Sequence, residues 1–594
     1  METVPHAVDP NRAAQHGSVV MRLLDELFPL VEGFYVDLHK NPELSHAEHR
    51  TASGVAEWLN RTGYEVHTGV GGTGVVGLLR NGPGPTVMLR ADMDALPLAE
   101  RTGLPYASTA REAGDDGAEV PVMHACGHDA HTACLVGAAD LLSETREEWS
   151  GTVMVVAQPG EETTDGAKRM LDDGLFERFG RPDVILAQNL GPQPAGLISH
   201  RSGVVMGATR SYRVRVFGEG GHAAMPHTAI DPVLIAANIV TRLQGVVARE
   251  VSPGEMAVLT VGRIRAGTRA NVIPDEAYLE ISTRAINDGV IAQLEEALGR
   301  IVRAEAAASG ATREPVVEAF RGVGITRNDP ESTEAVSAAH LAYFGEDYVI
   351  HLPDPSPGSE DIGLFGLPDD PQPIPYVLWF VGATPHDVWE AAPGSTPYEK
   401  MANVPSPHSP FFAPAREPTL RAGLAAITVA ALSYLGSDKP APFGGTDARS
   451  HEPLTSDTPG PLSQSAADGL APTGGAVPGP PPAESPGHFP DPAPASRPGG
   501  GSYESDAYDS AFLSSWPAPV AEDRPGGARD EERPSEKKAD EDEATLSADM
   551  SPYLDDDLPL GPPPAQEPPS GPAFSGPPPE SGSDEDRTGP GYGR

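Results

Sequence analysis

The sequence predicts an α/β protein with a mixed sheet flanked by helices, a small inserted α+β domain and a long disordered C-terminal tail. Apolar strands that end in charged residues alternate with helices through most of the first 436 residues. In the middle of this region the strands become half-polar, and beyond it Pro, Gly and acidic residues dominate. We expect a flexible N-terminus at 1–18, a first part of the larger domain at 19–207, the inserted domain at 208–322, a second part of the larger domain at 323–436 and the tail at 437–594.

The elements of the larger domain follow from the spacing of apolar residues. The segment MRLLDELFPLVEGFYVDLHK has helical spacing. TVMLRADMD and GTVMVVAQPGEE each run from an apolar stretch into charged residues, as buried strands do when their C-terminal ends open onto a site. HTACLVGAADLLSE predicts a helix that buries one face, and PTLRAGLAAITVAALSYLG predicts the last helix of the domain.

The inserted domain reads as strand, helix, strand, strand and helix. SYRVRVFGE alternates polar and apolar residues, which is typical of a half-exposed strand. DPVLIAANIVTRLQGVVARE follows as an amphipathic helix, MAVLTVGRIRAG and EAYLEISTRA as strands, and INDGVIAQLEEALGRIVRAEAAAS as a second helix. This order predicts a separate α+β unit.

Composition excludes several classes of protein. The formal net charge of −43 argues against nucleic-acid binding, which needs a basic surface. The chain has two cysteines, Cys126 and Cys134, so no disulfide framework is expected. We see no secretory signal, and the most apolar run, LAAITVAALSYL, is short for a membrane span and reads as amphipathic. A cytoplasmic protein that binds neither nucleic acid nor membrane is therefore expected.

The stretch VMHACGHDAH places Cys126 and His128 two residues apart at the start of a helix. Thiolate and imidazole are ligands for zinc, and imidazole and carboxylate also accept manganese, iron, cobalt or nickel. For this pair alone, a buried cysteine beside surface histidines is the commoner arrangement.

Carboxylates at two strand ends favour the metal interpretation. Asp92 and Asp94 close one apolar run, and Glu161 and Glu162 close another. Adjacent residues in β geometry point to opposite sides, so one glutamate could bind metal while the other reaches a water molecule. Each cluster alone could be a solvated charge, but their combination in one domain indicates a site.

Seven motifs in order carry a resemblance to a known family. LHKNPELSHAEHRTA, LRADMDALP, MHACGHDAHTA, QPGEE, GGHAAMPHTAIDPV, NVIPDEAYLEISTR and PHSPFFAPAREPTL resemble the aminoacylase-type metallopeptidases, peptidase family M20. They are most similar to the amidohydrolase branch, which includes hippurate hydrolases, auxin-conjugate hydrolases and N-acyl-amino-acid deacylases. The resemblance spans about residues 20–436.

The resemblance implies up to two divalent ions per subunit (Zn, Mn, Co or Ni) in the larger domain, and a lid domain that forms a homodimer. It implies that Cys126 bridges the ions, that Glu161 is the general base and that Asp94 orients ligands. The remaining ligands implied are His128, Glu162 and His408. His222 would stabilise an oxyanion in a neighbouring subunit, and Asn271 and Arg284 would hold the substrate carboxylate. Without the resemblance, a capping histidine, a turn asparagine and a surface arginine would be the simpler interpretations.

One position departs from the family pattern. Where relatives carry a fifth ligand, a histidine before a Pro-Ala-Gly turn, PDVILAQNLGPQPAG has Asn189. An amide oxygen is a weak neutral donor for a borderline cation, so one ion could bind loosely or be lost. His200 lies nearby in sequence, with no motif that makes it a substitute. The last ligand motif also reads SPH where many relatives read SNH.

Two functional hypotheses follow. The first is hydrolysis of an N-acyl amino acid or related amide by a metal-activated water. The second is that Asn189 marks a degenerate site that binds small molecules or partners without hydrolysis. Metal analysis separates them, since two ions per subunit favour the enzyme and none favours the binder. A third hypothesis makes the acidic tail the functional part.

Overall fold

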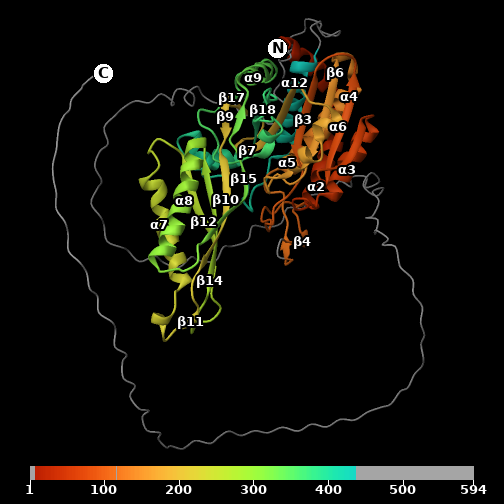
Figure 1. Ribbon diagram of the computed structural model, residues 1–594. Coiled ribbons are helices and arrows are strands. Elements are labelled where there is room, and N and C mark those ends of the chain that lie inside the picture. Colours follow the sequence, from red (N-terminus) through yellow and green to blue (C-terminus); the bar gives the residue numbers. More distant parts are fainter. Residues whose placement is uncertain (1–6, 115–116, 437–594) are drawn as a thin grey trace, which may run out of the picture. The chain divides into compact units, whose positions relative to one another are not determined.

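The computed structural model describes residues 7–114 and 117–436. The tail expected at 437–594 lies outside the described residues. The larger domain is built on an eight-stranded mixed sheet, as the sequence predicts (Figure 1). Its strands, from one edge to the other, are β1 (Glu65–Val70), β2 (Gly74–Asn81), β6 (Gly151–Gln158), β3 (Thr86–Asp92), β7 (Val184–Pro194), β18 (Tyr376–Thr384), β8 (Ile198–His200) and β17 (Val349–His351).

The four central strands β6, β3, β7 and β18 run parallel to one another. Their carboxyl ends therefore meet at one edge of the sheet, where the chain leaves β3 and β6 toward the predicted carboxylates. Each of these strands contributes to one buried apolar layer, with Met154 from β6, Met88 from β3, Ile185 from β7 and Leu378 from β18. Because ligands bind at the carboxyl ends of parallel strands, this edge is where a site is expected.

Helices cover both faces of the sheet. The helices of this domain are α1 (Pro10–Val20), α2 (Leu24–Lys40), α3 (His49–Arg61), α4 (His128–Glu144), α5 (Gly166–Asp172), α6 (Leu175–Phe179), α9 (Pro330–Phe344), α10 (His386–Ala391), α11 (Pro397–Met401) and α12 (Arg416–Leu435). Short strand pairs complete it: β4 (Arg111–Ala113) with β5 (Glu119–Pro121), and β9 (Gly203–Met206) with β16 (Thr326–Asn328).

Two helices are more deeply buried than the sequence indicated. α4 was expected to bury one face and α12 to be amphipathic, but almost every residue of α4 from His128 to Leu142, and every one of α12 from Ala422, is buried. A helix that is buried on all sides packs in a core, and here α4 contacts both α12 and α2. α12 is long and apolar enough to cross a membrane, but 89% of its most apolar window is buried within the protein.

The N-terminal segment differs from its expectation. Residues 1–18 were predicted to be flexible, but α1 begins at Pro10 and packs against α9 and α12. The Asp9 side chain accepts hydrogen bonds from the amides of Asn11 and Arg12, which caps the helix. Ala13 is fully buried. Small apolar residues dock this helix on the core although its sequence is largely polar.

The inserted domain is an antiparallel sheet with two helices, as predicted. Its strand order is β12 (Ala257–Ala266), β14 (Glu276–Ala285), β10 (Ala208–Phe217) and β15 (Val316–Val323). The helices α7 (Pro232–Arg249) and α8 (Asp288–Ala308) pack on the sheet through an apolar core of their own. The sequence did not indicate β15, because its residues are mostly exposed and alternate weakly. A two-stranded ribbon, β11 (Gly221–His222) with β13 (Val272–Ile273), extends from this domain.

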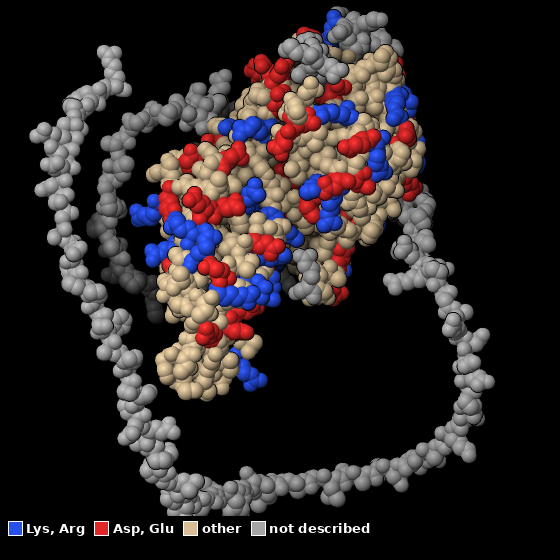
Figure 2. Space-filling view, in the orientation of Figure 1, with Lys and Arg blue, Asp and Glu red and all other residues tan. Residues whose placement is uncertain are grey.

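Figure 2 shows one face of the molecule, on which basic and acidic side chains are mixed over both the inserted domain and the larger domain. Several arginines of the inserted domain form ion pairs, as Arg215 does with Glu276 at 2.7 Å and Arg263 with Glu280 at 3.3 Å. These pairs lie across neighbouring strands and contribute modestly to the sheet.

Two helical glycines, one in each domain, test how tightly the helix α4 is packed. A Cβ on Gly137 of α4 would lie 2.6 Å from Leu424 Cδ1 and 2.9 Å from Val31 Cγ2, whereas a Cβ on Gly245 of α7 meets nothing within 4 Å. We predict that Gly245→Ala raises the free energy of unfolding by about 0.5–1 kcal/mol. Gly137→Ala should instead lower it by about 1–2 kcal/mol, because overpacking outweighs the helix propensity. Chemical denaturation measures both, and equal effects would contradict the packing at α4.

Candidate metal centre and active site

Cys126 and His128 lie on a turn at the N-terminus of α4. Gly127 between them has φ 85°, and a Cβ there would lie 2.7 Å from Leu190 Cδ1. Only glycine adopts this left-handed conformation without strain and leaves this space free. The turn directs both side chains into one cavity, as the two-residue spacing predicts.

The ring of His128 is oriented by Asp94. Nδ1 of His128 lies 3.3 Å from Oδ1 of Asp94, and both side chains are buried. Nε2 faces three carboxylates, with Oδ2 of Asp92 at 3.7 Å and the nearest oxygens of Glu161 and Glu162 at 4.0 Å and 3.9 Å. A carboxylate that holds one ring nitrogen and leaves the other free is the usual arrangement behind a metal-binding histidine.

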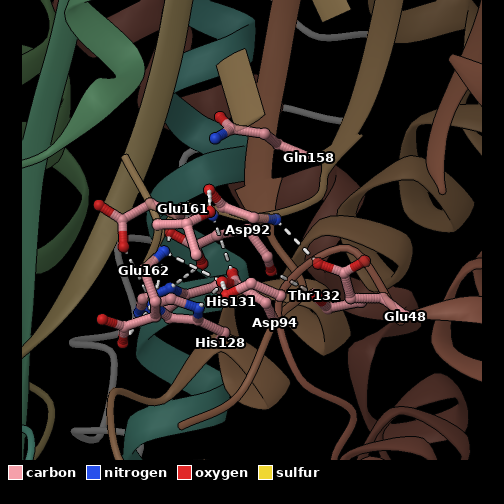
Figure 3. A network of polar contacts seen from close by, with 12 residues as sticks. Glu48, Asp92, Asp94, His128, His131, Thr132, Gln158, Glu161 and Glu162 are labelled. Carbon is pink, nitrogen blue, oxygen red and sulfur yellow. Dashed lines mark hydrogen bonds and ion pairs between the residues drawn. The ribbon is translucent and has the colours of Figure 1, made fainter. Parts of the chain in front are cut away.

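Glu161 and Glu162 lie in a turn that follows β6, so the expectation of β geometry is wrong. Both carboxylates approach His128 rather than pointing to opposite sides (Figure 3). The backbone amides of Glu161 and Glu162 donate to the two oxygens of Asp94, at 3.1 Å and 3.0 Å. Asp94 therefore holds the ring of His128 and the main chain of both glutamates together.

His408 reaches the cluster from the loop before α12. It has φ 69°, which is uncommon for a residue with a side chain, and its amide donates to the carbonyl of Ala125 at 2.8 Å. Nε2 lies 3.3 Å from Oε1 of Glu162. The interaction with Cys126, followed by that with Glu162, raises the pKa of His408 to about 10. Strained backbone of this kind is typical of functional sites.

Among the described residues, potential donor atoms form four close groups, and two of these groups share Glu162. The atoms of Cys126, Glu162 and His408 lie within 4.8 Å of one another, as do those of His128, Glu161 and Glu162. Oε1 of Glu162 is buried and faces Nε2 of both His128, at 3.9 Å, and His408, at 3.3 Å. Sulfur, nitrogen and oxygen donors that converge in this way fit a divalent transition metal.

Asn189 lies on β7 and lines the same cavity as these donors. Its amide nitrogen donates to Oε2 of Glu360 at 3.0 Å, and its Oδ1 is buried without a hydrogen-bond partner. The amide nitrogen of Asn189, which cannot bind a cation, thus holds the side chain toward Glu360. His200, the other residue near this position in sequence, is buried beside His340, with 2.9 Å between Nε2 and Nδ1.

His131 and Asp92 also lie close to His128, but their polar atoms are engaged. Nδ1 of His131 is 2.6 Å from Oδ1 of Asp92, and Nε2 accepts the amide of Leu190 at 2.8 Å. Oδ2 of Asp92 accepts from Arg90 at 2.8 Å. Both ring nitrogens of His131 are thus engaged, but its donor atoms and those of Asp92 and His128 also lie within 4.8 Å of one another, so these three residues form a further candidate group for a metal ion.

Sequence reasoning missed the buried charges behind Glu161. Arg90 is 1% exposed and donates to Asp92, Gln158 and Glu360, and more weakly to Asp361 at 3.3 Å. Burial, followed by the charges of Glu360, Glu162 and Asp361, raises the pKa of Glu161 well above its usual value. Burial also raises the pKa of Asp361, to about 8, against the opposing effect of Arg90. Glu360 and Asp361 were missed because they are far from Glu161 in sequence, and only the adjacent acids in PGSED could have indicated them.

A cavity of about 820 Å³ joins the donor cluster to the inserted domain. Arg284 contributes to its wall on that side, and its guanidinium donates to Ser359 Oγ at 3.3 Å. The hydroxyls of Thr209, Ser211 and Ser282 line the same wall. Arg284, one of the two predicted carboxylate-binding residues, therefore does face the cavity.

His222 and Asn271 lie elsewhere. Both border a separate hollow of about 1250 Å³ at the β11–β13 ribbon, and both are exposed. The amide of Ala223, next to His222, donates to the carbonyl of Asn271 at 3.2 Å. Within one chain the structure brings these two residues to each other but not to the donor cluster. Their roles at a neighbouring subunit remain predictions.

Comparison with known proteins decides the family. The model of peptidase family M20/M25/M40 matches residues 88–400. The chain belongs to this family. The hippurate hydrolase of Campylobacter jejuni is 36% identical over 349 residues, 58% of this chain and 88% of its own. The N-acetylcysteine deacetylase of Bacillus subtilis is 35% identical over 357 residues, 59% of this chain and 88% of its own.

Solved structures agree with this assignment. A protein of Bacillus subtilis described as a dinuclear metal binding peptidase from the M20 family is 28% identical, with a TM-score of 0.52. The similarity covers 69% of this chain and 100% of that one. The resemblance to the amidohydrolase branch is thereby confirmed, and the M20 chain is a metallohydrolase that acts on amide or peptide bonds.

The protonation of His408 makes metal binding to this M20 chain depend on pH. Below a pKa of about 10 the imidazole carries a proton that a cation must displace. We predict that binding of Zn²⁺ or Mn²⁺ releases protons at pH 7 and that affinity rises by up to about tenfold per pH unit for each proton released. Calorimetry in buffers of different ionisation enthalpy measures the release. His408→Ala should abolish this component, whereas His227→Ala, at an exposed histidine outside the cluster, should not change it.

Asn189 should leave the second of the two expected ions weakly held. We predict that the wild-type chain retains one ion per subunit after dialysis and that Asn189→His retains a second, because imidazole is the better ligand. Inductively coupled plasma mass spectrometry counts the ions. Two tightly held ions in the wild type would contradict the prediction and show that the amide is an adequate ligand.

Proposed function

We propose that this M20 chain hydrolyses N-acyl amino acids or related small amides. The observation that carries the proposal is the convergence of Cys126, Glu162 and His408 beside Glu161 in a cavity large enough for a small substrate. Relatives named as a hippurate hydrolase and as a deacetylase of N-acetylcysteine support this substrate class.

The cavity offers distinct surroundings to the two ends of such a substrate. Arg284 on the wall of the inserted domain would bind the carboxylate of the amino acid. Leu190, Met206 and Phe380 supply apolar wall that would contact the acyl group. The scissile amide would then lie near the donor cluster, where Glu161 and Glu162 border the same cavity.

Glu161 is suited to move the proton. When bound, a divalent ion would supply Lewis acidity and lower the pKa of a coordinated water from about 16 toward about 7. Glu161 is 6% exposed, and its raised pKa makes its carboxylate a stronger base than a solvated glutamate. Its carboxylate would accept a proton from the attacking water and deliver it to the amide nitrogen. The products are a carboxylic acid and an amino acid or amine.

The remaining parts of the proposal come from the family pattern. We propose Zn, Mn, Co or Ni as the metal, up to two ions per subunit, and a homodimer formed through the inserted domain. In that dimer His222 and Asn271 would approach the neighbouring subunit's cavity, consistent with their exposure on a separate ribbon. The cytoplasmic location stays a prediction.

A second candidate function is binding of acyl amino acids or partners without turnover. The hydrogen bond from Asn189 to Glu360 favours it, because the side chain at the family's histidine position is held to a carboxylate through its amide nitrogen and has only the weak amide oxygen Oδ1 left for a cation. The two candidates differ in a single assay: a chain that binds metal but hydrolyses no member of an N-acyl amino acid panel is a binder.

We predict that Glu161→Gln lowers kcat/KM on N-acetyl and N-benzoyl amino acids by about 10²- to 10⁴-fold, because the glutamine side chain cannot accept a proton from the attacking water. Metal content should be unchanged. Glu57→Gln, at an exposed position of α3, is the matched control and should keep wild-type activity. If Glu161→Gln turned over substrate at the wild-type rate, the assignment of the base would be wrong.

A further inference from the structure

The motif LHKNPELSHAEHRTA contributes to the resemblance but supplies no residue of the proposed reaction. Its central part, residues 44–48, lies against the turn that carries Glu161 and Glu162. We infer that this segment is a positioning device for that turn and that the carboxylate of Glu48 is its main anchor. The inference rests on the proposed function, because it assigns a role toward the proposed base.

Glu48 is fully buried and binds the start of the turn directly. Its Oε1 accepts the backbone amides of Gly160 and His46, each at 2.8 Å, and its Oε2 accepts the hydroxyl of Thr73 at 2.5 Å. Figure 3 shows its side chain directed toward the loop next to Asp94. A buried carboxylate is costly unless its oxygens are hydrogen-bonded, and here one of those bonds is to the residue before the proposed base.

The amides of three consecutive residues are held by two carboxylates. Gly160 donates to Glu48, and Glu161 and Glu162 donate to Asp94. The same segment also touches the second carboxylate, since the hydroxyl of Ser45 donates to Oδ2 of Asp94 at 2.6 Å. The main chain of the proposed base is therefore fixed from both sides by residues outside its own turn.

His46 holds the far end of the same turn. Its Nε2 lies 2.9 Å from Oγ1 of Thr163 and 2.8 Å from Oδ1 of Asp165. Its ring occupies the space beside Gly160, where a Cβ would lie 2.2 Å from the ring carbon Cε1. His46 itself has φ 65°, so the segment adopts an uncommon conformation at the point of contact. Glu48 and His46 together clamp residues 160–165.

A purely structural role makes a different prediction, and Glu43 provides the comparison. The carboxylate of Glu43 accepts the amides of Arg50 and Thr51, each at 2.8 Å, near the start of α3. It belongs to the same motif and makes the same kind of bonds, but it holds a helix and not the turn. Loss of Glu43 should therefore destabilise the fold without displacing Glu161.

The test compares Glu48→Ala, Glu48→Gln and Glu43→Ala in the full chain with metal bound. We expect Glu48→Ala to lower kcat on an N-acyl amino acid by about 10- to 100-fold and to change KM by less than about threefold. Glu48→Gln, which keeps an oxygen for the amide of Gly160, should restore kcat to within about threefold. Glu43→Ala should keep kcat near that of the wild type. Equal kcat in Glu48→Ala and Glu43→Ala would overturn the inference.

Hydrogen exchange of residues 160–165 provides a readout that does not need turnover. We expect exchange at Gly160, Glu161 and Glu162 to accelerate in Glu48→Ala and not in Glu43→Ala. If the wild type hydrolyses nothing, the proposed function fails while this measurement still decides the clamp. If Glu48→Ala does not fold, His46→Ala takes its place, with faster exchange and about 3- to 10-fold lower kcat expected. Wild-type exchange and kcat in His46→Ala would then overturn the inference.

Discussion

The site depends on one buried carboxylate, that of Asp94. It binds the ring of His128, the amides of Glu161 and Glu162 and the hydroxyl of Ser45, which come from three distant parts of the chain. Burial by itself would raise the pKa of Asp94, but the hydrogen bonds from His128, Ser45 and the amide of Glu162 lower it below its usual value. Asp94 therefore stays ionised and acts as a fixed acceptor, which is what allows the other side chains to meet with their ligand atoms free.

The buried charges next to Asp94 and Glu161 set the basicity of the proposed base, Glu161. Arg90 is the buried cation that binds Asp92 and Glu360, and it also approaches Asp361. Four carboxylates, counting Glu161, raise its pKa further above its usual value. Burial, followed by the neighbouring carboxylates, raises the pKa of Glu161, and the same carboxylates favour a divalent cation nearby. The same charges that make Glu161 basic thus make the cavity attractive to metal.

Asn189 shows how one substitution changes the balance of such a centre. The cluster of Cys126, Glu162 and His408 forms without it, since the turn before α4, the turn after β6 and the loop before α12 bring these donors together. On the other side of the cavity, the Asn189 amide is engaged with Glu360. The centre is therefore asymmetric, with sulfur, nitrogen and oxygen donors on one side and a neutral amide on the other.

The sequence by itself determined the fold class, with its mixed sheet and inserted domain, and it indicated candidate donor residues. Buried parallel strands and amphipathic helices have periods that are visible in one chain, and Cys126, His128, Glu161 and Glu162 are marked by short spacings at strand and helix ends. It predicted α4 and α12 as helices but not their burial on all sides, and it missed β15, because burial and weak alternation depend on what packs around an element.

Only the tertiary structure decided which of the candidates share a cavity. Arg284 faces the donor cluster, whereas His222 and Asn271 lie together on a separate ribbon. Other residues of the site act through contacts with distant parts of the chain, as between Arg90 and Asp361, which are 271 positions apart. Such contacts leave no local pattern to read, and they involve Glu48, Arg90, Glu360 and Asp361. Spacing along the chain identifies residues that can do chemistry, but hydrogen bonds across the fold decide which of their atoms remain free to do it.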